Sequence, residues 1–210
     1  MSYNVLETGL SIQRHGSVKY EIYEKIKGAY RIDMGFERLE KNLIDIIKEE
    51  QAKLGFRKEE IRLYYPLISL NHFFEAEDDV DEMQTRLEQF PEEVKGKLGD
   101  IRVTHKKDRF CLHIPEQGSV YVRENTAENE FIKKLVELLM NHGIKKEDIL
   151  NIFQKESDGI RVGDMDNGEF DFWVRFPEGN EDEYYYCFKD EGCHMIYHRF
   201  LPEDYADFGF

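Results

Sequence analysis

The last quarter of the chain, residues 157–210, alternates acidic and aromatic side chains at the two-residue spacing of a β-strand. It holds fourteen Asp or Glu, four Lys or Arg, and thirteen of the 28 Phe, Tyr and Trp residues. A solvated acidic tail would contain few aromatic residues, and the interior strands of a sheet would contain few acids. The pattern therefore predicts a folded sheet with one apolar face and one charged, aromatic face.

Turn signals predict how these strands pair. The tripeptide Asp190-Glu191-Gly192 fits a three-residue loop that ends in a left-handed glycine, which would place Lys189 opposite Cys193. Pairing Phe176 with Tyr184 in the preceding hairpin then assigns every side chain to a face, because the side-chain period is two. The predicted core face contains Phe170, Phe172, Val174, Phe176, Tyr184, Tyr186, Phe188 and Ile196.

The opposite face of this predicted sheet is the best candidate for a binding site. Aromatic and arginine side chains within a polar rim are typical of the residues that dominate protein interfaces. The alternative is that helices of the N-terminal half cover this face. The candidate residues are Asp171, Trp173, Arg175, Tyr185, Tyr197 and Arg199.

The N-terminal half shows the apolar spacing of amphipathic helices. The acidic run at residues 75–82 favours the positive end of the helix that follows it. Pro91 fits the first position of a short helix. Helices are predicted at residues 17–32, at 36–54, from 58 onward with a kink or a restart at Pro66, at 83–90 and at 91–98.

After residue 100 the apolar spacing changes to two. A meander of strands is predicted at Ile101–Thr104, Arg109–Ile114 and Val120–Arg123. Asn125 and Glu128 form a capping-box pattern for a helix over residues 126–140, and a short helix is predicted after Gly143.

These elements predict an α+β fold: a helical N-terminal half, then antiparallel β-meander strands, a helix hairpin and a C-terminal antiparallel sheet. A length of 210 residues suits one domain over 1–210, with possible lobes at 1–99 and 100–210.

The net charge of −15 argues against nucleic acid and anionic membrane surfaces as partners, and permits a basic protein partner. The longest uncharged run, Leu63–Phe74, is too short to span a membrane. Three cysteines do not form a disulfide framework, and the N-terminus lacks the pattern of a signal peptide. We therefore expect a cytoplasmic protein.

No motif predicts a metal, a cofactor or a catalytic group. His194 and His198 lie four residues apart on a predicted strand, about 13 Å, too far to share one zinc with Cys187 and Cys193. Cys111 and His113 share a face, but no second pair of ligands stands near them in sequence. The chain lacks a Gly-x-Ser-x-Gly elbow and a phosphate-binding loop.

Two segments resemble a known family. They are Tyr197-His198-Arg199-Phe200-Leu201-Pro202-Glu203-Asp204-Tyr205 and Gly99-Asp100-Ile101-Arg102-Val103. They resemble an uncharacterised bacterial family, a domain of unknown function, over most of the chain. The resemblance implies an intracellular bacterial protein, and it implies no activity, cofactor or catalytic residue.

We predict a non-enzymatic binding module that engages a basic protein partner through its acidic, aromatic sheet, as an immunity protein or antitoxin of this charge and size would. The alternative is a small-ligand-binding protein or an enzyme with a pocket between helices and sheet. That pocket would use some of His105, His113, His194 and His198.

Overall fold

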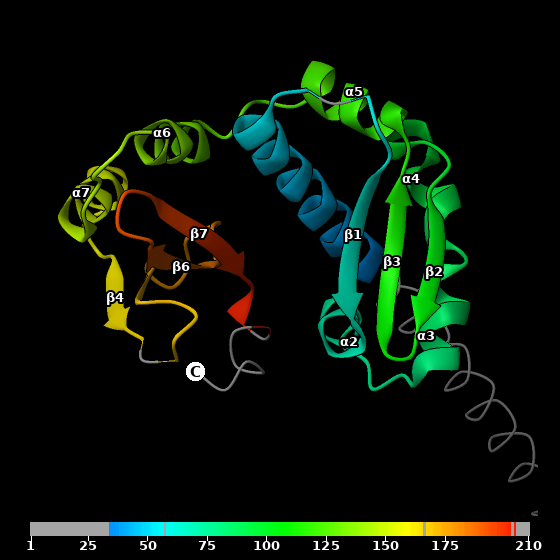
Figure 1. The fold of residues 1–210 in the computed structure, drawn as a ribbon. Coiled ribbons are helices and arrows are strands. Elements are labelled where there is room, and N and C mark those ends of the chain that lie inside the picture. The colour runs from blue at the N-terminus through cyan, green and yellow to red at the C-terminus, as the bar shows by residue number, and fades with distance from the viewer. Residues whose placement is uncertain (1–33, 57, 166, 203, 205–210) are drawn as a thin grey trace, which may run out of the picture.

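The computed structural model describes residues 34–202 and 204, except 57 and 166. The helix expected at residues 17–32 lies outside the described residues. The fold is α+β, with two antiparallel sheets and helices concentrated in the N-terminal half (Figure 1), as predicted. None of the helices in the described part of the chain is long and apolar enough to cross a membrane.

The first described helix, residues 34–54, confirms the predicted amphipathic pattern. Phe36, Leu39, Leu43 and Ile47 recur at three- and four-residue spacing and are all buried. The helix stops at Gly55, whose φ of 73° closes a backbone hydrogen bond to the carbonyl of Gln51 at 2.9 Å.

The helix predicted from residue 58 is wrong, because the segment forms strand β1 (Ile61–Pro66). Leu63 and Tyr65 face the core, whereas Arg62 and Tyr64, which alternate with them, are exposed. This alternation is the two-residue period of a strand. Helix α2 (Leu67–Phe74) begins directly after Pro66. Of the predicted kink or restart at Pro66, the structure shows a helix that starts directly after this proline, but it follows a strand and not an earlier helix.

Two short helices then lead to the second strand. Asp79 caps α3 (Val80–Leu87) by accepting hydrogen bonds from the amides of Asp81 and Glu82. The helix therefore begins within the acidic run, three residues earlier than predicted. Pro91 lies in the first turn of α4 (Phe90–Leu98), as predicted.

Sheet A contains three strands in the order β1-β3-β2, with β2 at Arg102–Lys106 and β3 at Arg109–Ile114. The strand predicted at Val120–Arg123 is wrong, because these residues belong to helix α5 (Glu116–Asn125). Gly118 allows this helix to pack closely on the sheet, since a Cβ there would lie 2.5 Å from Ile114 Cγ2.

The helix hairpin exists, but its first helix starts later than predicted. Asn129, and not Asn125, caps α6 (Glu130–Leu139) by accepting a hydrogen bond from the amide of Ile132. Helix α7 (Lys146–Glu156) follows.

Sheet B contains four strands in the order β4-β5-β6-β7. The chain therefore closes with a simple antiparallel meander, as predicted. The strands are β4 (Arg161–Asp164), β5 (Phe172–Arg175), β6 (Tyr185–Asp190) and β7 (Met195–Phe200).

One predicted register in sheet B is confirmed and one is wrong. Phe172 pairs with Phe188, as the predicted pairing of Phe176 with Tyr184 requires. Between β6 and β7, however, Lys189 pairs with Ile196 and not with Cys193, so the register is shifted by three residues. An odd shift exchanges the two faces of β7.

The shift arises because the last turn is longer than the three-residue loop predicted for it. Asp190 pairs with Met195, and Glu191 donates a backbone hydrogen bond to His194 across the turn. Ile196 consequently points outward and is 40% exposed, whereas Tyr197 is buried. The predicted core face is therefore wrong at Ile196. It is also wrong at Phe170, whose buried ring packs against His198 and Phe200 on the outer face of β7.

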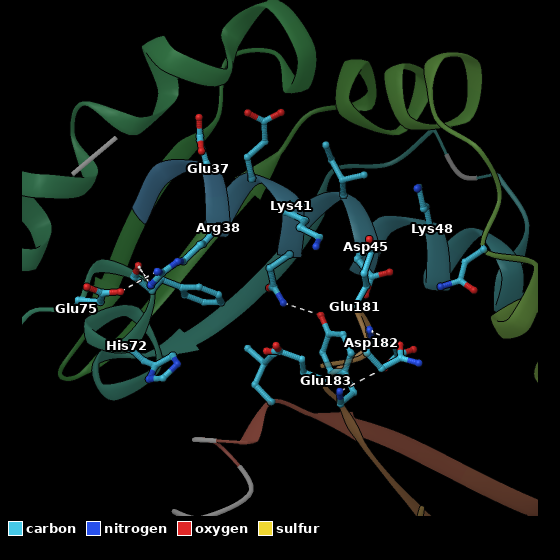
Figure 2. A pocket seen from close by; sticks show the side chains of 18 of the residues that line it. Glu37, Arg38, Lys41, Asp45, Lys48, His72, Glu75, Glu181, Asp182 and Glu183 are labelled. Carbon is cyan, nitrogen blue, oxygen red and sulfur yellow. Dashed lines mark hydrogen bonds and ion pairs between the residues drawn. The ribbon is translucent and has the colours of Figure 1, made fainter. Parts of the chain in front are cut away.

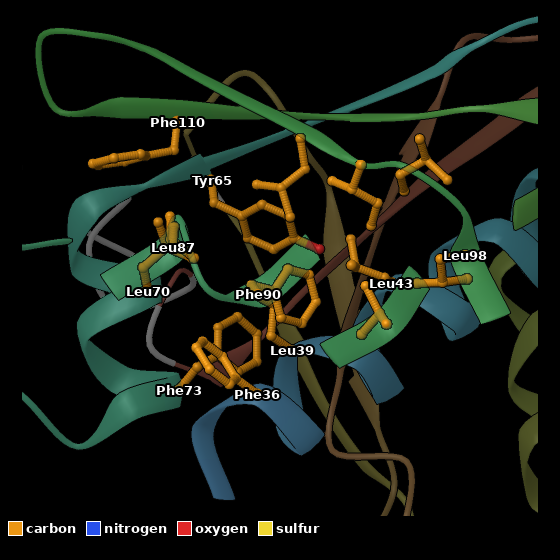
Figure 3. Close-up of a cluster of buried hydrophobic side chains, with 14 of the residues drawn as sticks. Phe36, Leu39, Leu43, Tyr65, Leu70, Phe73, Leu87, Phe90, Leu98 and Phe110 are labelled. Atoms are coloured by element: carbon orange, nitrogen blue, oxygen red, sulfur yellow. The ribbon is translucent and has the colours of Figure 1, made fainter. Parts of the chain in front are cut away.

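The described chain packs around two hydrophobic clusters. Helices 34–54 and α2–α5 cover one face of sheet A and enclose the first cluster (Figures 1 and 3). Helices α6 and α7 cover the inner face of sheet B and enclose the second. The buried residues of the two clusters divide between Val122 and Phe131, although Leu201 packs against the first cluster and Ala52 against the second. Lobes were predicted at 1–99 and 100–210, and the single domain over 1–210 stays a prediction.

Candidate functional site

The polar side of helix 34–54 joins the two sheets. Tyr65 on β1 donates a hydrogen bond to Asn42 Oδ1 at 2.6 Å, and Asn42 Nδ2 donates to the hydroxyl of Tyr184 at 2.7 Å. Asn42 is almost fully buried, so its side-chain oxygen and its side-chain nitrogen both need hydrogen-bond partners. This chain of hydrogen bonds links residues 142 positions apart and fixes the segment before β6 against the helix.

A buried arginine strengthens this junction. The side chain of Arg199 on β7 is 3% exposed, and its Nη1 lies 2.9 Å from Asp45 Oδ2. Its Nε donates a hydrogen bond to Glu49 Oε2, and Lys53 Nζ lies 2.7 Å from the other oxygen of Glu49. The guanidinium also stacks over the ring of Tyr184 at 4.3 Å. Two carboxylates of one helix therefore share one arginine of sheet B, and Lys53 of the same helix adds a second positive charge.

The buried groups shift each other's proton affinity in opposite directions. Burial alone would raise the pKa of Glu49, but Arg199 and then Lys53 outweigh it and lower that pKa below 4.5. Burial raises the pKa of Asp182, although Tyr186, which donates a hydrogen bond to it, and Arg199 partly oppose the rise. Glu49 therefore remains ionised, whereas Asp182 holds its proton more readily than a solvated aspartate.

Replacing Glu49 by Gln is expected to destabilise the protein by about 2 kcal/mol at neutral pH, and by less in acid. The pKa of Glu49 is lower in the folded than in the unfolded state, so its contribution is complete above pH 4.5 and is lost as pH falls through the folded pKa. Urea unfolding of both proteins at about pH 7 and about pH 3.5 measures this difference. The control is Glu50→Gln; an equal difference between wild type and E49Q at both pH values would contradict the assignment.

A cleft of about 1530 Å³ opens beside this junction (Figure 2). One wall is helix 34–54 with α2, and the other is the loop 179–184 that leads into β6. Seven carboxylates and four Lys or Arg line it. The carboxylates are Glu37, Glu40, Asp45, Glu75, Glu181, Asp182 and Glu183, and the cations are Arg38, Lys41, Lys48 and Lys97.

Two of the four cations in the cleft are paired with carboxylates of its own lining. Arg38 Nη2 lies 2.7 Å from Glu75, and Lys97 is paired with Glu40. Glu181 and Glu183, by contrast, are exposed and form no ion pair with any described residue. The loop that carries them therefore presents free negative charge to the opening.

Local hydrogen bonds shape this acidic loop. The amide of Asn180 donates to the carbonyl of Pro177, and Asn180 Oδ1 accepts a hydrogen bond from the amide of Asp182. Gly179 has a φ of 85°, which a larger residue adopts only with strain. The two exposed glutamates thus project from a defined turn whose third acid, Asp182, is held inward by Tyr186.

One known family matches most of the chain, including the cleft. A family profile described as "Domain of unknown function, E. rectale Gene description (DUF3877)" matches residues 36–209, well over half of the chain. The chain belongs to this DUF3877 family. Every residue that lines the cleft falls within the matched range. No curated protein and no solved structure matched the chain.

Four of the six predicted site residues of this DUF3877 chain lie together on the outer face of sheet B. Arg175 Nη1 donates a hydrogen bond to the hydroxyl of Tyr185 at 2.8 Å, and the rings of Trp173 and Tyr185 are 5.2 Å apart. Asp171 lies 3.1 Å from Lys189. This face is aromatic, as predicted, but its charges are balanced, so it offers little net attraction to a basic partner.

The other two predicted site residues, Tyr197 and Arg199, are on the inner face. The three-residue register shift turns them toward helix 34–54, where Tyr197 is 5% exposed. They belong to the buried junction and not to an exposed interface. Their prediction as outer-face residues is therefore wrong.

The histidines of the DUF3877 chain are dispersed. His105 packs on Phe110 and His113 lies near Glu60, both in sheet A, while His194 lies against His142 and His198 against Phe170. None of the four predicted histidines lines the cleft.

The cysteines also lie apart. Cys111 and Cys187 are buried, Cys193 is exposed, and burial raises the pKa of the Cys187 thiol to about 12. Among the described residues no group of three or more His, Cys, Asp or Glu side chains could hold a metal ion.

Sequence reasoning missed the cleft because its walls come from segments far apart in the chain. One local signal was present: Asn42, Asp45 and Glu49 form a polar stripe, three and four residues apart, on an otherwise amphipathic helix. Such a stripe indicates a second contact for the helix when it faces an arginine-bearing strand.

Proposed function

We propose that this protein is a non-enzymatic, cytoplasmic binding module that holds a basic segment of a partner protein in the cleft. The observation that carries the proposal is the excess of carboxylates along the cleft, with Glu181 and Glu183 free at its opening. A lysine or arginine of the partner would pair with these two glutamates. The proposal needs no metal, cofactor or nucleic acid.

The size and polarity of the cleft favour a protein segment over a small molecule. Small-ligand pockets are mostly apolar and enclose about 300–1,000 Å³. This cleft is larger and is open to solvent, and eleven of its lining residues are Asp, Glu, Lys or Arg. An extended peptide can fill such a volume and satisfy several carboxylates together.

The buried junction gives the cleft a fixed back wall. Asp45 and Tyr184 belong to both the junction and the cleft lining. Because Arg199 and Asn42 hold them, the two walls keep their separation before a partner binds. Preorganisation of this kind lowers the entropic cost of binding.

The double substitution Glu181→Lys and Glu183→Lys is expected to weaken binding of a basic probe at least about tenfold, because it reverses the free charge at the opening. The probe is a fluorescein-labelled peptide of alternating Lys and Ala, twelve residues long, titrated by fluorescence anisotropy. Binding by wild type is expected to weaken steeply as salt is raised.

The matched control is Glu169→Lys with Glu191→Lys. Both glutamates are exposed, lie in turns of sheet B outside the cleft lining and form no ion pair with a described residue, and their substitution changes the net charge equally. The control is expected to bind the probe within about twofold of wild type. If the two variants weaken probe binding equally, the loss reflects only the change in net charge, and the proposal that the cleft is the binding site would be contradicted.

A further variant separates the cleft from the outer face of sheet B. Trp173→Ala removes the central aromatic residue of the face predicted from sequence, and under this proposal it leaves probe binding unchanged. Loss of binding in W173A with retention in the Glu181 and Glu183 variant would assign binding to that face instead.

A further inference from the structure

The outer face of sheet A has the opposite charge to the rest of the chain. The three strands of this sheet contain four Lys or Arg and no Asp or Glu, in a protein whose net charge is −15. The core-facing positions alternate with these cations, so all four lie on the side that faces away from the first hydrophobic cluster. They are Arg62, Arg102, Lys106 and Arg109.

Among the described residues, most side chains of this face are exposed, although Cys111 at its centre is buried. The described helices that pack on sheet A contribute to the first cluster, on its other face (Figure 1). All four cations are exposed, and Tyr64, between their two rows, is 61% exposed. An exposed tyrosine among arginines has the composition of an interface anchor.

One row of the face already binds a carboxylate of the chain itself. Arg62 Nε donates to Glu60 Oε1 at 3.0 Å, His113 Nδ1 lies 3.0 Å from the same oxygen, and Arg102 Nη2 lies 3.4 Å from Oε2. Arg62, His113 and Arg102 are cross-strand neighbours. Hydrogen bonds from His113 and then Arg62 lower the pKa of Glu60. The first row therefore holds one carboxylate between two arginines and a histidine.

A second row has no carboxylate. Arg109 pairs with Lys106 across the β2–β3 turn, four residues along the strands from the first row, which corresponds to about 13 Å. Neither side chain forms an ion pair with a described residue. Tyr64 and Thr104 lie between the rows, on the two edge strands.

We propose that the outer face of sheet A docks an acidic, extended segment of another protein, with a carboxylate on Arg109 and Lys106 and its neighbouring residues against Tyr64. Successive same-face residues of an extended chain are about 7 Å apart, so its carboxylates reach both rows when they are four residues apart. In that position a second carboxylate competes with Glu60 for the first row. This surface is separate from the cleft and has the opposite charge.

A protein segment fits this face better than a nucleic acid strand. Single-stranded RNA is bound on sheets by two or three aromatic residues that stack bases, whereas this face exposes one. The group held on the first row is a carboxylate, which is the group that an acidic protein segment presents.

The test uses three labelled probes with the full chain: a ten-residue peptide of alternating Glu and Val, the same peptide with Gln for Glu, and a ten-nucleotide oligouridine. Anisotropy titration at low salt is expected to show binding of the Glu peptide only. The double substitution Lys106→Glu and Arg109→Glu is expected to weaken that binding at least about tenfold, and Tyr64→Ala several-fold.

The matched control is Lys134→Glu with Lys155→Glu, which places the same charge change on the exposed sides of α6 and α7. Circular dichroism melts establish that each variant is folded. Equal binding of the Gln peptide, tighter binding of oligouridine, or equal losses in the two double variants would each overturn the proposal. These outcomes are independent of the cleft, because the probe and the variants differ from those used there.

Discussion

Replacing Arg199 by Met is expected to destabilise the protein by about 3–5 kcal/mol. The substitution leaves Asp45 and Glu49 partly buried beside each other without their shared cation. Uncompensated buried charge costs far more than the loss of an exposed ion pair. Urea unfolding followed by circular dichroism measures the change in the free energy of unfolding.

Arg175→Met is the matched control, because Arg175 contacts a tyrosine on the outer face of the same sheet. It is expected to cost less than about 1 kcal/mol. If R199M also cost less than about 1 kcal/mol, Asp45 and Glu49 would be adequately solvated without the arginine, and the junction would not hold the sheets together.

Phe153→Ala is expected to cost about 3–5 kcal/mol. Phe153 on α7 is fully buried, and its ring lies 4.7 Å from that of Phe131 and 5.0 Å from that of Tyr186. It therefore connects both hairpin helices to sheet B, and its removal leaves a cavity that these rigid rings cannot fill by moving. The same urea titration measures the loss.

Ile196→Ala provides the comparison, since Ile196 is 40% exposed on the outer face of β7. It is expected to cost less than about 1 kcal/mol. This pair also tests the observed register, because the register predicted from sequence puts Ile196 in the core. A larger loss from I196A than from F153A would contradict the structure.

Sequence patterns were sufficient where the relevant interactions are local. The apolar stripe of helix 34–54, its stop at Gly55 and the turn at Pro91 depend on neighbours within four residues. The β5–β6 register was also predictable, because the alternation from Phe172 to Phe188 allows one arrangement that buries the aromatic residues.

The errors arose where two local solutions compete. Gly192 suits a loop of three residues and also the longer observed turn, and only the burial of Met195 and Tyr197 against the second cluster selects the latter. Similarly, residues 58–66 lack a decisive period until β3 provides a partner for β1. Tertiary contacts decided both cases.

The candidate site was less predictable than the fold. Its defining contacts join Asn42 to Tyr184 and Glu49 to Arg199, which are 142 and 150 residues apart. Composition indicated an acidic surface and therefore a basic partner, but it placed the charge on the outer face of the C-terminal sheet. The folded chain instead pairs the acids there and leaves Glu181 and Glu183 free at the cleft.

Hydrogen–deuterium exchange with and without the Lys-Ala peptide tests the central claim most directly, because it locates binding without any substitution. Binding in the cleft predicts slower amide exchange in the loop 179–184 and along residues 37–48 of the first described helix, with sheet A unchanged. Slower exchange centred on β5 around Trp173, or on sheet A, with no change in the loop 179–184, would contradict it.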